Sequence, residues 1–167
     1  AKAGLVTMYG QTWRTSGTAT EPGAQHTAKQ EAKAAQVETS GSVASTSIRW
    51  SSLKGDFDTV FAATVDVLLH PTFRADKLQL ARRQMETAIS RRNDDASDIS
   101  IREAIKLAYG ADNPYARQPE YATVDAVTLE DLKAWHDRTV VPNNMIVAVS
   151  GDFNGASMEA ALRKAFE

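Results

Sequence analysis

The run Val-Pro-Asn-Asn-Met-Ile-Val-Ala-Val-Ser-Gly-Asp-Phe at residues 141–153 contains the longest uninterrupted apolar stretch of the chain, Met145 to Val149. The pair Pro142-Asn143 breaks regular structure before this stretch, and Gly151-Asp152 breaks it afterwards. An apolar run of this length between two breakers is typical of a buried β-strand. It falls well short of the ~18 residues that cross a bilayer. We therefore expect a strand here and no membrane span.

The rest of the chain is helical apart from one hairpin. Apolar and polar residues alternate from Ala44 to Trp50, which predicts a half-buried strand over residues 43–50, with residues 37–40 as its hairpin neighbour. Most other segments repeat apolar residues at helical spacing. They predict helices over residues 3–14, 24–36, 57–68, 75–93 and 101–108, from Thr128 onward, and from about residue 157. This order predicts an α+β fold with an antiparallel sheet and helices packed mainly on one face.

Length and composition exclude several classes of function. The 167 residues suit a single domain, and 19 basic against 21 acidic residues give a net charge of -2. A protein without surplus positive charge is poorly suited to neutralising phosphates, so we do not expect a nucleic-acid partner. The chain has no cysteine. Disulfides, thiolate metal sites and cysteine nucleophiles are therefore excluded.

The three histidines, His26, His70 and His136, are far apart in the sequence. Zinc hydrolases commonly place two histidines close together on one helix and add a carboxylate that activates water. No such pair occurs here, and each histidine is more simply interpreted as a surface or packed side chain. The glycine-rich phosphate-binding patterns and the Gly-x-Ser-x-Gly nucleophile turn are also absent.

Six short segments between residues 51 and 153 follow one another in a distinctive order and spacing: residues 51–58, 66–73, 93–95, 109–115, 128–132 and 141–153. Together they resemble the insulinase/pitrilysin family of zinc peptidases, in particular the first of its two similar half-domains. The resemblance implies that residues 1–167 form one pitrilysin-like half-domain. Family half-domains usually begin with strands ahead of the zinc helix, so we expect this one to be N-terminally incomplete, lacking those initial strands.

The zinc motif of the family is degenerate in this chain. The resemblance implies a His-x-x-Glu-His motif between a Gly-Leu pair and a Gly-Thr pair, matched here by Gly4-Leu5 and Gly17-Thr18. Thr7 stands at the position of the first histidine, and Gly10 at that of the glutamate. Gln11 stands at that of the second histidine. All three functional positions are therefore replaced.

The position of the third zinc ligand is also replaced. The resemblance places a glutamate on the helix that precedes Asp94-Asp95. Counting forward from Gln11 and aligning back from residues 93–95 both place this glutamate at Ala88. Ala81, one heptad earlier, occupies the place of another acidic residue of active members. Threonine and glutamine are weak zinc ligands, and glycine and alanine have no ligating side chain. We expect no bound zinc, no other cofactor and no catalytic residue.

The first functional hypothesis is a non-catalytic homologue that forms part of a peptidase chamber and helps an active partner to bind peptide. The partner would be a second half-domain or an active peptidase subunit, and a sheet edge could accept the peptide by strand addition. The alternatives are a structural scaffold that binds no peptide, and an active zinc metallopeptidase that uses residues outside this chain. The family resemblance is consistent with a location in the bacterial periplasm.

Overall fold

The computed structural model describes residues 2–166, without the side chains of His26 and Gln30. Within that range, β1 (Gln36–Gly41) and β2 (Thr46–Ser51) are strands, and two short 3₁₀ helices are η1 (Lys54–Asp56) and η2 (Pro142–Asn144). The α-helices are α1 (Leu5–Trp13), α2 (Gly23–Glu31), α3 (Phe57–Leu69), α4 (Ala75–Arg91), α5 (Ala96–Tyr109), α6 (Tyr121–Asp125), α7 (Leu129–Thr139) and α8 (Gly155–Phe166).

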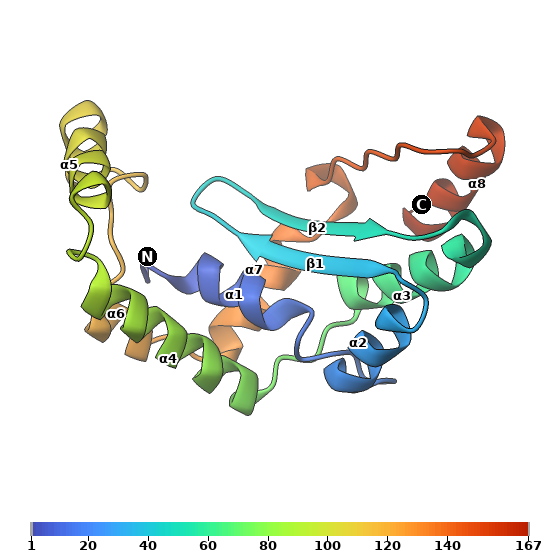
Figure 1. The fold of residues 1–167 in the computed structure, drawn as a ribbon, viewed down its shortest axis with the longest axis horizontal. Coiled ribbons are helices and arrows are strands. Elements are labelled where there is room, and N and C mark those ends of the chain that lie inside the picture. The colour runs from blue at the N-terminus through green and yellow to red at the C-terminus, as the bar shows by residue number, and fades with distance from the viewer. Residues whose placement is uncertain (1, 167) are drawn as a thin grey trace.

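Strands β1 and β2 form the predicted antiparallel hairpin, with Val37 opposite Trp50. The second strand begins at Thr46, three residues later than predicted, because the backbone N–H of Ser42 donates to the carbonyl of Ser45 at 2.8 Å and closes the turn. Helices α1 and α3 both contact the hairpin. The α+β class with an antiparallel sheet is therefore confirmed (Figure 1).

The prediction of a buried strand at Met145 to Val149 is wrong. This segment runs beside β2 in Figure 1, but within residues 2–166 its backbone joins no ladder. Ile146 is 99% exposed. The physical reason is a cavity that separates the segment from β2, described below, so that the apolar run has no strand to pair with.

The main hydrophobic core is built around α1. Met8, Tyr9 and Trp13 of this helix are almost completely buried. The indole Nε1 of Trp13 donates to the carbonyl of Val67 at 2.9 Å, which ties α1 to α3. The other buried members of this core come mainly from α3, α4, α6 and α7: Val67, Leu68, Leu78, Ala81, Met85, Ile89, Val124, Val127 and Leu132. The first helix thus occupies the centre of the fold.

Helix α5 lies apart from this core. It stands away from the body in Figure 1 and has no buried residue. It begins at Ala96, five residues earlier than predicted, because the side chain of Asp95 accepts from the backbone N–H of Ser97 and caps the helix. The excursion that carries α5, residues 93–119, leaves the body after Arg92 and returns at Glu120. The guanidinium of Arg92 donates to both carboxylate oxygens of Glu120, at 2.8 and 3.0 Å.

The other predicted helices agree with the structure to within a few residues, with one clear exception. The second helix was expected to reach residue 36 but ends at Glu31, because Ala34 turns the chain with φ 50 and β1 begins at Gln36. The capping box expected at the start of α7 is present, with the Thr128 side chain accepting from the backbone N–H of Asp131. Among residues 2–166, no helix has both the length and the apolar composition that a membrane crossing needs.

A buried aromatic cluster links α1 to α7. The Tyr9 hydroxyl and Nδ1 of His136 are hydrogen-bonded at 2.9 Å. The rings of Trp13 and Phe73 lie 5.8 and 6.0 Å from the His136 ring, centre to centre. Burial lowers the pKa of His136 below its usual range, because this apolar surrounding disfavours the imidazolium form. His136 is therefore a packed histidine rather than an available ligand.

The protein should lose stability between pH 7.5 and pH 5.5. The folded state holds His136 neutral, whereas the unfolded chain takes up a proton near pH 6.5, so acidification favours unfolding. Urea unfolding at the two pH values should show the lower free energy of unfolding at pH 5.5. His136→Gln should reduce this difference, and the exposed control His70→Gln should retain it. An unchanged difference in His136→Gln would contradict the assignment.

Candidate functional site

The part of α1 that the family resemblance matches to a zinc motif borders a cavity of about 250 Å³ between α1, β1 and α4. Of the sequence-predicted positions, Gly10, Gln11 and Ala81 line this cavity, whereas Thr7 and Ala88 do not. Ala88 is exposed on α4. The remaining lining residues are Arg14, Thr15, Glu38, Thr39, Lys77, Leu80 and Gln84. The structure thus brings together part of the predicted constellation and adds polar side chains from β1 and α4.

One stripe of α4 accounts for the additional residues on that helix. Lys77, Ala81, Gln84 and Ala88 follow one another at intervals of four, three and four residues, so they share a helix face. Helices α1 and α4 run in opposite directions in Figure 1. The later turns of α1 therefore meet the earlier turns of α4. Lys77 and Gln84 are not among the residues predicted from the sequence, although their spacing from Ala81 places them on the same helix face.

The backbone of Gly10 packs directly against the backbone of the hairpin at Ser40 and Gly41, and we call this the sealed contact. A Cβ atom at this residue would lie 2.2 Å from the backbone nitrogen of Gly41 and 2.5 Å from the carbonyl carbon of Ser40. The Thr39 hydroxyl donates to the Gly10 carbonyl at 2.7 Å and fixes the same contact. Distances this short leave no room for any side chain. A glutamate general base cannot occupy this position without displacing α1 from β1.

The polar groups of the cavity do not suit a zinc ion. The Arg14 guanidinium donates to the Thr27 hydroxyl at 3.0 Å and lies 3.4 Å from the Glu38 carboxylate, while Lys77 adds a second cation. Zinc requires neutral imidazole, thiolate or carboxylate donors that converge on one point. Nowhere in the part of the chain that the structure describes do three His, Cys, Asp or Glu side chains converge in this way.

The histidines are likewise dispersed. His26 lies in α2, and its side chain is outside the described structure. His70 follows α3, and its Nδ1 lies 3.2 Å from the carboxylate of Asp66. His136 is buried against Tyr9, as described above. None of the described histidines lines the cavity beside Gly10.

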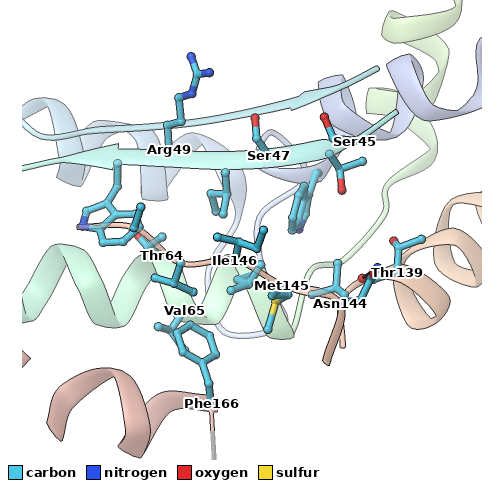
Figure 2. Close-up of a pocket in the computed structure, with 18 of the residues that line it drawn as sticks. Ser45, Ser47, Arg49, Thr64, Val65, Thr139, Asn144, Met145, Ile146 and Phe166 are labelled. Atoms are coloured by element: carbon cyan, nitrogen blue, oxygen red, sulfur yellow. Dashed lines mark hydrogen bonds between the residues drawn. The ribbon is translucent and has the colours of Figure 1, made fainter. Parts of the chain in front are cut away.

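A larger cavity of about 620 Å³ separates β2 from the extended segment after η2. Figure 2 shows Met145 and Ile146 of that segment on one side and the strand that carries Ser47 and Arg49 on the other. The Arg49 side chain points away from the cavity in this view. Helices contribute six apolar side chains to the lining: Trp13, Phe61, Val65, Leu68, Trp135 and Phe166. We call this cavity the slot.

No model of a known protein family matches the chain. An uncharacterized zinc protease of Mycobacterium leprae is 30% identical over 117 residues, which cover 68% of this chain and 26% of that protein. Two solved structures superpose over nearly the whole chain. A protease from Helicobacter pylori gives a TM-score of 0.81 at 18% identity, covering 99% of this chain and 40% of its own.

The second structure is the peptidase M16 inactive domain from Pseudomonas fluorescens, with a TM-score of 0.85 at 20% identity, covering 98% of this chain and 40% of its own. The chain has the fold of a peptidase M16 half-domain. The predicted resemblance to the insulinase/pitrilysin family is therefore confirmed. The chain spans about a quarter of the length of its zinc protease relative and two fifths of each solved structure.

Replacing Gly10 by alanine should destabilise the protein severely. The added methyl group collides with the backbone of Ser40 and Gly41, so we expect a loss of about 3 kcal/mol or more in the free energy of unfolding. A matched control is Gly55→Ala in η1, where a Cβ meets nothing within 4 Å, with an expected change within about 0.5 kcal/mol. Urea unfolding measures both. Equal stability of the two variants would refute the sealed contact.

Zinc should not stabilise the protein. A metal that binds the folded state stabilises it by an amount that grows with the logarithm of the metal concentration divided by Kd, and the cavity beside Gly10 lacks the donors for such binding. Thermal unfolding with zinc chloride and with a chelator should give the same midpoint, and metal analysis of the purified protein should find no stoichiometric zinc. A midpoint that rises with zinc and falls with the chelator would contradict this expectation.

Proposed function

We propose that this chain is a non-catalytic half of a zinc-peptidase assembly and helps an active half to bind peptide. The observation that carries the proposal is the sealed contact of Gly10 with β1, because it removes the space for a general base at the position of the family's glutamate. Similarity to a domain described as inactive and to a protein described as a zinc protease supports a role in such an assembly.

The cavity beside Gly10 offers a surface that suits a peptide. Lys77 and Arg14 supply positive charge, and Gln11 and Gln84 supply amide groups, all of which can donate to peptide carbonyls or carboxylates. Thr39 brings β1 to the cavity wall. In the described hairpin β1 pairs with β2 alone, so its other edge is available for strand addition by an extended peptide.

A structural scaffold is the second candidate, and the exposed helix α5 favours it. Ile101 and Leu107 of this helix are 58% and 89% exposed. Large apolar side chains at such exposure are suited to contact with another protein. A scaffold would use α5 and leave the cavity beside Gly10 without a role. An active metallopeptidase, the third alternative, would have to take its zinc ligands from outside residues 1–167.

Peptide cleavage separates these candidates. The full-length protein should cleave no peptide alone, and it should increase cleavage when mixed with a paralogue that keeps the complete His-x-x-Glu-His motif. Lys77→Ala should raise the KM of the mixture about tenfold, the effect of losing one charge-assisted hydrogen bond. The matched control Lys164→Ala, on α8 and outside the lining of the cavity, should leave KM unchanged.

Each alternative has its own outcome in this assay. Zinc-dependent cleavage by the protein alone would overturn the proposal in favour of an active peptidase. Assembly with the paralogue without any change in KM, and without an effect of Lys77→Ala, would overturn it in favour of a scaffold. Loss of assembly in Ile101→Asp together with Leu107→Asp would then identify α5 as the scaffold surface.

A further inference from the structure

We propose that the cavity beside Gly10 is a pocket for one carboxylate of a bound peptide, held between Lys77 and Arg14. This specificity rests on the proposed function and adds to it that peptides bringing a negative charge to the cavity bind better than neutral or basic ones. The carboxylate belongs either to an aspartate or glutamate side chain or to the free C-terminus of the peptide. Both sources present the same pair of oxygen atoms to the protein.

The lining of the cavity carries two cations and one anion. Lys77 comes from α4, Arg14 from α1 and Glu38 from β1. The side chain of Glu38 is 68% exposed and lies 3.4 Å from the Arg14 guanidinium, so water screens this pair strongly. A positive charge therefore remains in the cavity. Among the described residues, the slot offers no such charge, since its one charged lining residue, Arg49, points away from it (Figure 2).

The Lys77 ammonium has no carboxylate partner of its own. Among residues 2–166 it forms no ion pair, although its residue is partly buried. Asp76, the adjacent carboxylate, instead accepts from the guanidinium of Arg74 at 2.9 Å. The other lining residues on α4 are uncharged: Leu80, Ala81 and Gln84. An ammonium in this position gains Coulomb energy when an anion binds beside it.

The Arg14 guanidinium is held in place by the protein. Its side chain is only 16% exposed. One amino group donates to the Thr27 hydroxyl at 3.0 Å, and that hydroxyl donates to the Gly23 carbonyl at 2.9 Å. A guanidinium has five N–H donors, and in the described structure Thr27 and Glu38 take up two of them. Because the group is already fixed, a carboxylate that binds to its other donors loses less entropy in ordering it.

Two side-chain amides and the volume of the cavity favour a single carboxylate. Gln11 and Gln84 line the cavity, and within residues 2–166 their side chains make no hydrogen bond. Each amide can donate to a carboxylate oxygen. The volume of about 250 Å³ lies below the ~300 Å³ at which pockets for drug-sized ligands begin. The cavity therefore suits one side chain or one chain end of a peptide.

Charge determines which peptide group binds best in this pocket. A neutral carbonyl oxygen can accept from the same donors as a carboxylate. Hydrogen bonds between charged partners are roughly twice as strong as those between neutral partners. Lys77 and Arg14 also repel a cationic side chain of the peptide. We therefore expect affinity to fall from carboxylate to neutral to cationic groups at this position.

Four short peptides test this preference on the full-length protein. They share one alanine–threonine sequence and differ in a central glutamate or glutamine and in a free or amidated C-terminus. Isothermal titration calorimetry should show that a carboxylate lowers Kd about tenfold. A difference between the glutamate and glutamine peptides identifies a side chain as the source, and one between free and amidated peptides identifies the C-terminus. Equal Kd values for all four, or binding of none, would overturn the proposal.

Gln84→Glu and Gln79→Glu provide the matched comparison. Both variants replace an amide by a carboxylate at an exposed position of α4, but of the two residues only Gln84 lines the cavity. The new carboxylate of Gln84→Glu competes for Lys77 and Arg14, so the preference for carboxylate peptides should disappear. Gln79→Glu should retain the preference. An equal preference in the two variants would contradict a carboxylate pocket in this cavity.

Charge reversal at Lys77 tests the ammonium itself. Lys77 lies in the first turn of α4, where the helix dipole favours a carboxylate, so Lys77→Glu should fold normally. This variant should bind the glutamine peptide more tightly than the glutamate peptide. Lys164→Glu on α8, outside the lining, should keep the original order. An unchanged order in Lys77→Glu would refute the role of Lys77.

The carboxylate pocket and the proposed function can fail separately. If the protein increases cleavage by its paralogue equally for all four peptides and binds them equally, the proposed function stands and the pocket is refuted. If it leaves cleavage unchanged but binds carboxylate peptides about tenfold more tightly, the pocket stands and assistance to an active half is refuted.

Discussion

The fold depends on the close approach of α1 to β1 at two glycines. A Cβ atom on Gly10 would meet the backbone of Ser40 and Gly41, and one on Gly41 would lie 1.9 Å from the carbonyl oxygen of Val6. Backbone-to-backbone contact of this kind brings the largest buried side chains of α1, Trp13 among them, to the centre of the core. Buried side chains of α3, α4 and α7 join those of α1 in the same core.

The same contact limits the chemistry of the protein. The space that a side chain at position 10 would need is filled by the backbone of Ser40 and Gly41. Under the proposed function, this is the position that the family resemblance assigns to a general base. The cavity that remains beside Gln11 is lined by lysine, arginine and amide side chains, which suit recognition of carbonyl or carboxylate groups better than activation of water.

Most of the elements could be predicted from the sequence because their causes are local. The alternation before Trp50 and the capping box at Thr128 depend on neighbouring residues, and both features are present. The replaced motif positions Thr7, Gly10, Gln11 and Ala88 were read from sequence alone, but their spacing did not show that Gly10 meets Gly41, a residue 31 positions away. The strand expected at Met145 to Val149 failed for a related reason, since apolar character is local whereas strand pairing needs a neighbour.

The excursion that carries α5 has an evolutionary consequence. Its two ends are joined by the double hydrogen bond between Arg92 and Glu120, and its helix contributes no buried side chain. Changes of length or sequence in α5 thus leave the contacts that hold α1, α4 and α7 in place. An insertion or deletion in this projecting helix therefore requires no rearrangement of the core.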